Sequence, residues 1–341
     1  MSTIIEVKDI RRAFRSPKKE EGMKGTMKLL FKPEFSEHEA LKGVNFKIEQ
    51  GSFVGLIGAN GAGKTTLLKI LSGLIPPTSG SARVLGIDPF DRPMNFRHQI
   101  SLVMGQKAQL WWDLPAVDAF DLLKAIYEIP EKTYRERLNT LTELLDVTKH
   151  LNTQIRRLSL GERMKMELIG ALLHWPKVIF LDEPTIGLDV LAAAKLREFL
   201  RVFNQREKVT IILTSHNMDD IERLCSRVLI LRNGEMIFDG QPSKLIQQGA
   251  CRLRVRLKEE IPAAKLSQWT GLAESAIEIA EPEADDEGDA GDIKTIYFET
   301  KQEAVVTVLQ ALMKNCSIID MGVEEPSLES VIQRIYSDPK A

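Results

Sequence analysis

Residues 58–65 read Gly-Ala-Asn-Gly-Ala-Gly-Lys-Thr, a spacing of glycines before a lysine and a threonine that suits a phosphate-binding loop. The apolar run at residues 53–57 predicts a buried strand before this loop, and the apolar positions at residues 67–71 predict a helix after it. Glycine lets the backbone turn tightly and aim its N–H groups at phosphate oxygens, while the helix N-terminus adds a partial positive charge. The sequence therefore predicts a phosphate site between a strand and a helix.

Within this loop, we expect the Lys64 side chain to reach the β- and γ-phosphates of a nucleotide and the Thr65 hydroxyl to ligate Mg²⁺. The other residues expected to contact the nucleotide are Gly58, Asn60, Gly61, Gly63 and Thr66. The competing interpretation is a glycine-rich turn that carries a lysine, because short motifs recur by chance. Residues further along the chain decide between the two.

Two more apolar runs end in polar residues. Residues 178–182 are four apolar residues followed by Asp182, which predicts a buried parallel strand whose carboxylate emerges at the ligand-binding edge of the sheet, where it can hold Mg²⁺. Glu183 follows and points the other way if strand alternation continues, so it is our candidate for the general base that polarises water. His216 follows the apolar run at residues 209–214 and should reach the same edge. Taken alone, the acidic pair could be a solvated strand end and the histidine could be structural.

Five further segments complete a series that starts with the loop at residues 58–65: Gln106, Leu-Ser-Leu-Gly-Glu-Arg at 158–163, Val-Ile-Phe-Leu-Asp-Glu-Pro-Thr at 178–185, Gly-Leu-Asp at 187–189 and Thr-Ser-His at 214–216. In this order and spacing, residues 1–245 resemble the nucleotide-binding subunit of an ATP-binding cassette (ABC) transporter. The resemblance implies an ATPase with ATP and Mg²⁺ as cofactors. It also implies that Gln106 takes part in catalysis and in Mg²⁺ binding, beside Glu183 and His216.

Residues 159–162 resemble the signature loop of that family, usually Leu-Ser-Gly-Gly-Gln, with Leu160 in place of a glycine and Glu162 in place of the glutamine. Ser159 precedes the amphipathic stretch 163–173 and reads as a helix N-cap, which is also compatible with binding a phosphate at the helix N-terminus. The resemblance implies that Ser159, Gly161 and Glu162 bind the ATP held by a second copy. A head-to-tail dimer follows, and the two departures put the tightness of its closure in question.

Adenine binding is expected to involve an aromatic ring, because stacking supplies much of a site's affinity for a base. Phe14 lies where the family places that ring, after a first strand predicted at residues 4–7. The alternative is an aromatic residue of the core.

The expected architecture is α/β: a P-loop NTPase ABC nucleotide-binding domain at residues 1–248 with a helical subdomain at about 108–174. Helical periodicity within that subdomain covers residues 116–127, 134–145 and 163–173. Asn233-Gly234 between two apolar runs predicts a β-hairpin near the end of this domain.

After residue 248 the pattern changes. The order strand, helix, strand, strand, helix, strand predicts a small C-terminal α+β domain of ferredoxin-like type at residues 249–341. A final helix at residues 328–336 is expected to pack back on it.

Composition limits the classes of binding partner and the cellular compartment to be expected. A net charge of -2 gives no global reason to expect nucleic-acid binding, and no apolar run approaches the roughly 18–20 residues that span a bilayer. Three cysteines without paired or metal-ligand spacing favour reduced thiols in the cytosol. We expect a cytoplasmic protein held on the inner face of the membrane by permease subunits.

Two segments are candidates for the membrane side. Residues 15–32 carry five lysines with apolar residues at helical spacing, which predicts a basic amphipathic helix for a membrane surface or a partner groove; a solvated loop is the alternative. Trp111 and Trp112 are costly in a loop unless covered, either by a permease or within the helical subdomain.

These features resemble the ATPase subunits of bacterial exporters whose permease is a separate chain, such as antibiotic, viologen and polysaccharide exporters. The alternative class is a soluble ABC-type ATPase that acts on ribosomes or nucleic acid. It is disfavoured because one phosphate-binding loop and no sustained heptads are found. A catalytically dead regulator is disfavoured because Lys64, Asp182, Glu183 and His216 are all present.

Overall fold

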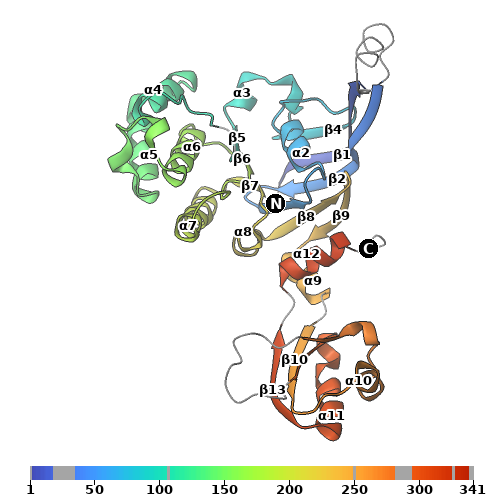
Figure 1. Ribbon diagram of the computed structural model, residues 1–341. Coiled ribbons are helices and arrows are strands. Elements are labelled where there is room, and N and C mark those ends of the chain that lie inside the picture. Colours follow the sequence, from blue (N-terminus) through green and yellow to red (C-terminus); the bar gives the residue numbers. More distant parts are fainter. Residues whose placement is uncertain are drawn as a thin grey trace, which may run out of the picture. The chain divides into compact units, whose positions relative to one another are not determined.

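The computed structural model describes residues 2–17, 35–105, 108–248, 251–280, 294–324 and 327–337. Gln106, most of the segment 15–32 and residues 281–293, which carry seven carboxylates, lie outside the described residues. The chain divides into two compact units, Met1–Pro242 and Ser243–Ala341 (Figure 1), so the division falls after the first residue of helix α9 (Pro242–Gln248), whereas the sequence predicts a division after residue 248. No helix among the described residues is both long and apolar enough to cross a bilayer.

A six-stranded sheet forms the centre of the first unit, in the order β5-β6-β7-β3-β8-β9. Every neighbouring pair is parallel except β8 with β9. Strands β3 and β7 are buried along their whole length, as expected for a parallel sheet covered on both faces. The strands are β3 (Phe53–Gly58), β5 (Ile100–Met104), β6 (Val178–Asp182), β7 (Thr210–Thr214), β8 (Arg227–Arg232) and β9 (Glu235–Gly240).

The predicted hairpin joins β8 to β9. Asn233 and Gly234 both have positive φ, 52° and 84°, which is the backbone geometry of the two-residue turn that matches strand twist. The Gly234 N–H donates to the Ala62 carbonyl, so the hairpin tip supports the phosphate-binding loop.

A second, antiparallel sheet has the order β2-β1-β4, with bounds β1 (Thr3–Pro17), β2 (Phe35–Glu49) and β4 (Ser79–Val84). The first strand is much longer than the predicted residues 4–7, and residues 15–17 continue it where a helix was expected. Ion pairs of Arg11 with Glu39 and of Arg15 with Glu37 join β1 to β2. Cross-strand pairs of opposite charge can stabilise a strand that has few apolar residues. The alternation of apolar residues therefore did not predict the full length of β1.

Helix α2 (Lys64–Leu71) lies between these sheets. Its buried Leu67 and Leu71 belong to one apolar cluster with Leu41 of β2 and Leu56 of β3. The helix that follows the phosphate-binding loop is therefore fixed against both sheets, which holds its N-terminus in place.

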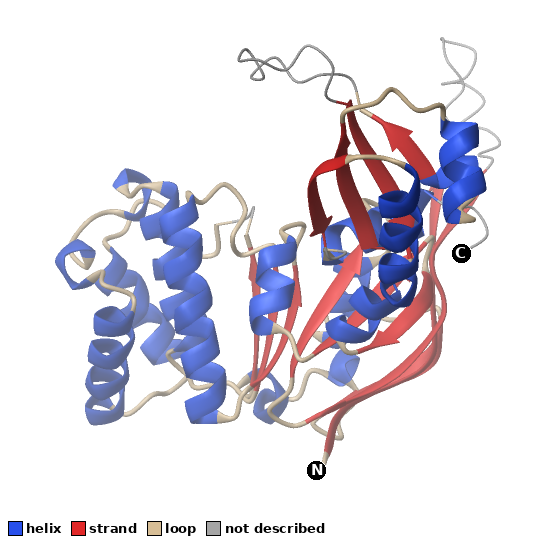
Figure 2. Cartoon of the chain, turned by 90° about the horizontal axis from the view of Figure 1, so that it is seen from below, coloured by secondary structure: helices blue, strands red, loops and turns tan. Residues whose placement is uncertain are grey.

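Three helices, α4 (Ala116–Ile126), α5 (Glu131–Leu144) and α6 (Leu160–Leu172), form the helical subdomain at one side of the sheets (Figure 2). Helix α5 begins three residues before the predicted residue 134, directly after Pro130, whose fixed φ suits a helix start. Helix α6 begins at Leu160 and includes the rest of the signature loop. The remaining helices of this unit are α3 (Met94–Arg97), α7 (Val190–Glu207) and α8 (Met218–Leu224).

The second unit has a four-stranded antiparallel sheet in the order β11-β12-β10-β13, the split βαββαβ arrangement predicted for a ferredoxin-like domain. Its elements are β10 (Cys251–Leu257), α10 (Ala263–Thr270), β11 (Ile277–Ile279), β12 (Lys294–Thr300), α11 (Val305–Asn315), β13 (Ile318–Glu324) and α12 (Leu328–Ser337). Alternate residues of β10 are buried against α10 and α11 in one cluster. Among the described residues this cluster has no member from α12, although Leu328 and Ile332 of that helix are buried, so the packing of the last helix on this core stays a prediction.

Candidate functional site

The phosphate-binding loop connects the carboxyl end of β3 to the N-terminus of α2, as the sequence predicts. Gly61 and Gly63 have positive φ, and a Cβ on Gly63 would lie 2.6 Å from the Ala40 carbonyl oxygen. A Cβ on Gly58 would lie 2.8 Å from the Leu231 carbonyl oxygen. Only glycine therefore allows the loop to pack this closely against β2 and β8, and Asn60 and Gly61 remain exposed at its tip.

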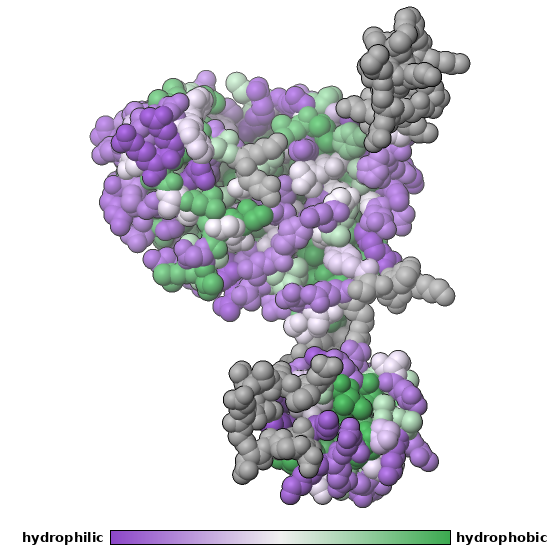
Figure 3. Space-filling view, viewed as in Figure 1, coloured by the Kyte–Doolittle hydropathy of each residue, from purple (hydrophilic) through white to green (hydrophobic). Residues whose placement is uncertain are grey.

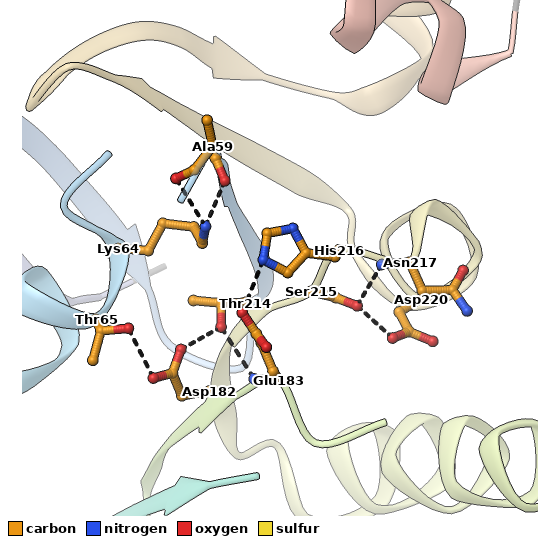
Figure 4. Close-up of polar contacts among 11 residues, drawn as sticks. Ala59, Lys64, Thr65, Asp182, Glu183, Thr214, Ser215, His216, Asn217 and Asp220 are labelled. Carbon is orange, nitrogen blue, oxygen red and sulfur yellow. Dashed lines mark hydrogen bonds and ion pairs between the residues drawn. The ribbon is translucent and has the colours of Figure 1, made fainter. Parts of the chain in front are cut away.

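Lys64 is buried at the mouth of the loop. Its ammonium donates to the carbonyls of Gly58 at 2.5 Å and Ala59 at 3.2 Å (Figure 4). Burial lowers the pKa of Lys64, while Glu183 and Asp182 act against that shift. Within the described part of the chain, the hydrogen bonds of this ammonium go to neutral carbonyls, so Lys64 is well placed to bind an anionic group as a further partner.

Asp182 ends β6 as predicted and receives two hydroxyl donors. Thr65 Oγ1 lies 2.9 Å from Asp182 Oδ2, and Thr214 Oγ1 lies 2.6 Å from Asp182 Oδ1. The side chains thus meet from helix α2 and two adjacent strands (Figure 4). Thr65 and Asp182 together present hard oxygen ligands, which is the donor set that Mg²⁺ takes when phosphates and water complete its shell.

Glu183 lies beyond the strand, which corrects the reason given for its orientation. Strand β6 ends at Asp182, and Glu183 has a left-handed φ of 56° in place of extended backbone. Its N–H donates to the carbonyl and hydroxyl oxygens of Thr214, which stabilise this unfavourable conformation. A Cβ on Gly105 would lie 2.1 Å from the Glu183 carbonyl oxygen, so a glycine is needed there as well.

His216 lies next to Glu183. The distance between His216 Nε2 and Glu183 Oε1 is 3.0 Å, and the side chains are 49% and 18% exposed. The carboxylate is therefore oriented by a neighbouring ring at the edge of the sheet and still reaches solvent. The structure brings together Lys64, Thr65, Asp182, Glu183 and His216, five residues that the sequence placed in one site.

Sequence reasoning did not identify Thr214 as part of this site. Its hydroxyl bridges Asp182 and the Glu183 backbone, and it is fully buried at the end of β7. The available signal was a threonine directly before Ser215 and His216, since a hydroxyl at the end of a buried strand needs a hydrogen-bond partner.

The signature loop has a complete capping box. The Glu162 N–H donates to Ser159 Oγ, and Glu162 Oε2 accepts from the Ser159 N–H at 2.9 Å and from its hydroxyl at 2.8 Å. These bonds to Ser159 lower the pKa of Glu162, and His150 Nε2 lies 2.8 Å from Glu162 Oε1. The predicted N-cap is therefore confirmed. The Glu162 carboxylate forms part of the cap of helix α6. A capping box takes glutamate as well as glutamine at this position, which explains how a carboxylate is accommodated where the family usually has glutamine.

Phe14 lies inside β1 opposite His38 of β2, where it is 38% exposed, so it is not a core aromatic. The Arg12 guanidinium covers the ring at 4.6 Å from its centroid. Strand β2 reaches the phosphate-binding loop two residues beyond His38, at Ala40. The position is compatible with an adenine platform on the loop side of this sheet.

Trp111 and Trp112 are 45% and 46% exposed. The alternative that the helical subdomain covers these two side chains is therefore wrong. The Arg163 guanidinium lies 4.8 Å from the Trp112 ring centroid. Trp112 lines a cavity of about 440 Å³ together with Leu160, Arg163, Ile186 and others, which opens beside the signature loop.

Residues 41–186 match the family described as ABC transporter. The ABC transporter ATP-binding protein NatA of Bacillus subtilis is 31% identical over 209 residues, which cover 61% of this chain and 85% of NatA. The probable multidrug ABC transporter ATP-binding protein YbhF of Escherichia coli is 34% identical over 218 residues, which cover 63% of this chain and 37% of YbhF. A solved ATP-binding subunit of an ABC transporter superposes with a TM-score of 0.59 at 28% identity and covers 72% of this chain and 93% of that one. The chain belongs to the family of ABC transporter ATP-binding proteins.

Proposed function

We propose that this chain is the ATP-hydrolysing subunit of an ABC exporter whose permease is a separate protein. The observation that carries the proposal is the meeting of Lys64, Thr65, Asp182, Glu183 and His216 at the carboxyl edge of one parallel sheet. Ligands of open α/β sheets bind at this edge, and these side chains are the ones that phosphoryl transfer to water requires.

The groups present fit ATP with Mg²⁺. Glycines let the loop pack against two strands at the N-terminus of α2, which begins at Lys64, and Thr65 and Asp182 would hold the metal. When bound, Mg²⁺-ATP supplies the γ-phosphoryl group, whose bond to the β-phosphate breaks as water attacks. Gln106 stays a candidate for metal binding and catalysis.

Glu183 would accept a proton from the attacking water, because its carboxylate is partly exposed at this edge and is held by strained backbone. His216 would orient that carboxylate across the 3.0 Å contact between them.

Phe14 would stack on the adenine. The phosphate contacts would come from Gly58, Asn60, Gly61, Gly63 and Thr66, as the sequence predicts.

A second copy would complete the site in a head-to-tail dimer. The signature loop with Ser159 and Gly161 opens on a surface with exposed apolar side chains, among them Val190 at 85% and Leu191 at 67% exposure. Figure 3 shows apolar patches that interrupt the hydrophilic cover in the region of α6 and α7. Apolar side chains this exposed gain from being covered by a partner.

The permease would hold this chain on the cytoplasmic face of the membrane. The exposed Trp111-Trp112 loop and its arginine neighbour support a protein contact there, since half-exposed tryptophans and arginine are typical of interface centres. YbhF, the multidrug relative, favours export over import. Membrane contact through residues 15–32 stays a prediction, and nucleic acid is not an expected partner.

Steady-state ATP hydrolysis by the purified chain with Mg²⁺ tests the chemistry. We expect Glu183→Gln to leave ATP binding intact and to slow turnover by roughly 10²–10⁴, the usual contribution of a positioned acid or base. Asp219→Asn, an exposed carboxylate on α8, is the matched control and should keep the parent rate. Turnover of Glu183→Gln within a few-fold of the parent would remove Glu183 from this role.

A photo-crosslinker at Trp112 in cells tests the transport assignment. Capture of a membrane protein that copurifies with the chain is the expected result. Capture of a ribosomal or DNA-bound partner instead would replace the exporter proposal with the soluble alternative.

A further inference from the structure

Behind the Glu183–His216 pair lies a buried carboxylate that no part of the mechanism above uses. Asp220, on helix α8, is fully buried. Its Oδ1 accepts from Arg197 Nη1 at 2.8 Å, and its Oδ2 accepts from Thr185 Oγ1 at 2.5 Å and from Ser215 Oγ at 2.6 Å. Arg197 comes from helix α7 and is also buried. One carboxylate thus joins two helices and two loops.

The two loops are the ones that carry the reacting groups. Thr185 lies two residues after Glu183, and Ser215 directly precedes His216. The Ser215 hydroxyl also accepts from the Asn217 N–H at 3.0 Å, so the residues on both sides of His216 are tied together (Figure 4). The segment that bears the histidine and the segment that bears the glutamate are therefore anchored to the same oxygen atom, Asp220 Oδ2.

Anchoring matters here because both reacting side chains lie outside regular strands. Glu183 has left-handed backbone just after β6, and His216 is the second residue after the end of β7, so both lie beyond the regular strands. Their contact is 3.0 Å, and shifts of about 1 Å in a catalytic group can cost 10²-fold in rate. The Arg197 guanidinium pairs with Asp220 at 2.8 Å, so the charge of the buried carboxylate is compensated inside the protein.

We propose that Asp220 is a positioning residue for ATP hydrolysis: through Thr185 and Ser215 it sets the distance between Glu183 and His216. The inference rests on the proposed ATPase function and names the group that aligns its catalytic pair. Arg197 acts indirectly, because its ion pair holds Asp220 in place. In the described part of the chain, the side-chain hydrogen bonds of these four residues join them to one another and to the Asn217 N–H, and none goes to Lys64, Thr65 or Asp182, so we expect their effect to fall on turnover and to spare ATP affinity.

Two variants remove one hydroxyl each and keep the buried ion pair. We expect Thr185→Val and Ser215→Ala to lower kcat by about 10-fold while KM for ATP stays within about twofold, because alignment is lost and binding is not. Thr185→Ser keeps the hydroxyl and should restore the parent kcat. Asp220→Asn should lower kcat by about 100-fold, with the exposed neighbour Asp219→Asn as its matched control.

A further variant separates positioning from folding. Replacing a buried ion pair by apolar residues of similar volume often preserves stability, so Arg197→Met combined with Asp220→Leu should fold with a Tm near that of the parent. If Asp220 acts only on stability, this double variant recovers turnover; if it positions the pair, kcat stays low in a folded protein. We expect the second result.

The outcomes are distinguishable. A parent chain that binds Mg²⁺-ATP without hydrolysing it would overturn the proposed function, and this inference with it. Parent turnover together with Thr185→Val and Ser215→Ala at the parent kcat would overturn the positioning role alone, and recovery of kcat in the apolar double variant would do the same.

Discussion

At the scale of single residues, His174 shows how burial decides the behaviour of a group outside the site. Its Nε2 lies 3.0 Å from the Ile100 carbonyl oxygen, and its ring stacks on Tyr127 with centroids 4.0 Å apart. Burial lowers the pKa of His174 from 6.5 to about 4, and the charges of His98 and Arg137 act in the same direction. The folded protein therefore keeps this ring neutral at pH values where the unfolded chain protonates it.

This shift predicts acid sensitivity of the first unit. Between pH 6.5 and about 4 the unfolded chain binds a proton that the folded chain does not, so the free energy of unfolding falls as the pH falls through this window. His174→Phe keeps an aromatic partner for Tyr127 and should remove a pH-dependent part on the order of 1–3 kcal/mol. Urea unfolding from pH 4.5 to 7.5 measures it, with His38→Gln, an exposed histidine, as the control. Equal pH dependence in His174→Phe and the parent would contradict this account.

Some features of the candidate site could be predicted from the sequence and others could not. The position of Asp182 and His216 at the carboxyl edge of the sheet could be predicted, because each comes after an apolar run that forms a buried parallel strand. The backbone conformation of Glu183 could not, since its left-handed φ depends on Thr214 and not on strand alternation. Asp220 was missed because its partners lie 5 to 35 residues away along the chain, where no periodicity connects them.

At the scale of elements, helix α6 starts with a capping box at the signature loop. The cap satisfies N–H groups that the first turn leaves without partners, and it fixes the direction in which the helix N-terminus points. Strand β1 was predicted too short for a different reason. A strand stabilised by arginine–glutamate pairs to its neighbour shows little apolar alternation.

Ser159→Ala tests the cap. We expect a loss of about 1 kcal/mol in stability, the usual cost of removing an N-cap hydroxyl, while Ser159→Thr should stay close to the parent. Affinity of the isolated chain for ATP should not change, because Ser159 is proposed to serve a neighbour's nucleotide. Thermal unfolding and a nucleotide-binding titration give the two readouts. Weaker ATP binding by a monomeric Ser159→Ala chain would show that the serine acts in its own subunit.

At the scale of the whole molecule, the proposed dimer would build each ATP site from parts of two copies of the first unit. The phosphate-binding loop and the Glu183–His216 pair form one part, and the signature loop with the exposed Val190 and Leu191 forms the other. The cavity beside the signature loop is lined by Trp112, Leu160 and Ile186 and by none of the phosphate-binding residues. Two chains related head to tail would bring each part to its complement.

Light scattering coupled to size-exclusion chromatography of the Glu183→Gln chain, with and without Mg²⁺-ATP, tests this claim most directly. We expect a monomer without nucleotide and a dimer with Mg²⁺-ATP, since slow hydrolysis keeps the nucleotide in place between the two copies. Adding Ser159→Arg, which puts a bulky cation into the signature loop, should abolish the dimer and leave ATP binding unchanged. A Glu183→Gln chain that binds ATP and stays monomeric at micromolar concentration, both alone and with its copurified permease, would contradict the composite site.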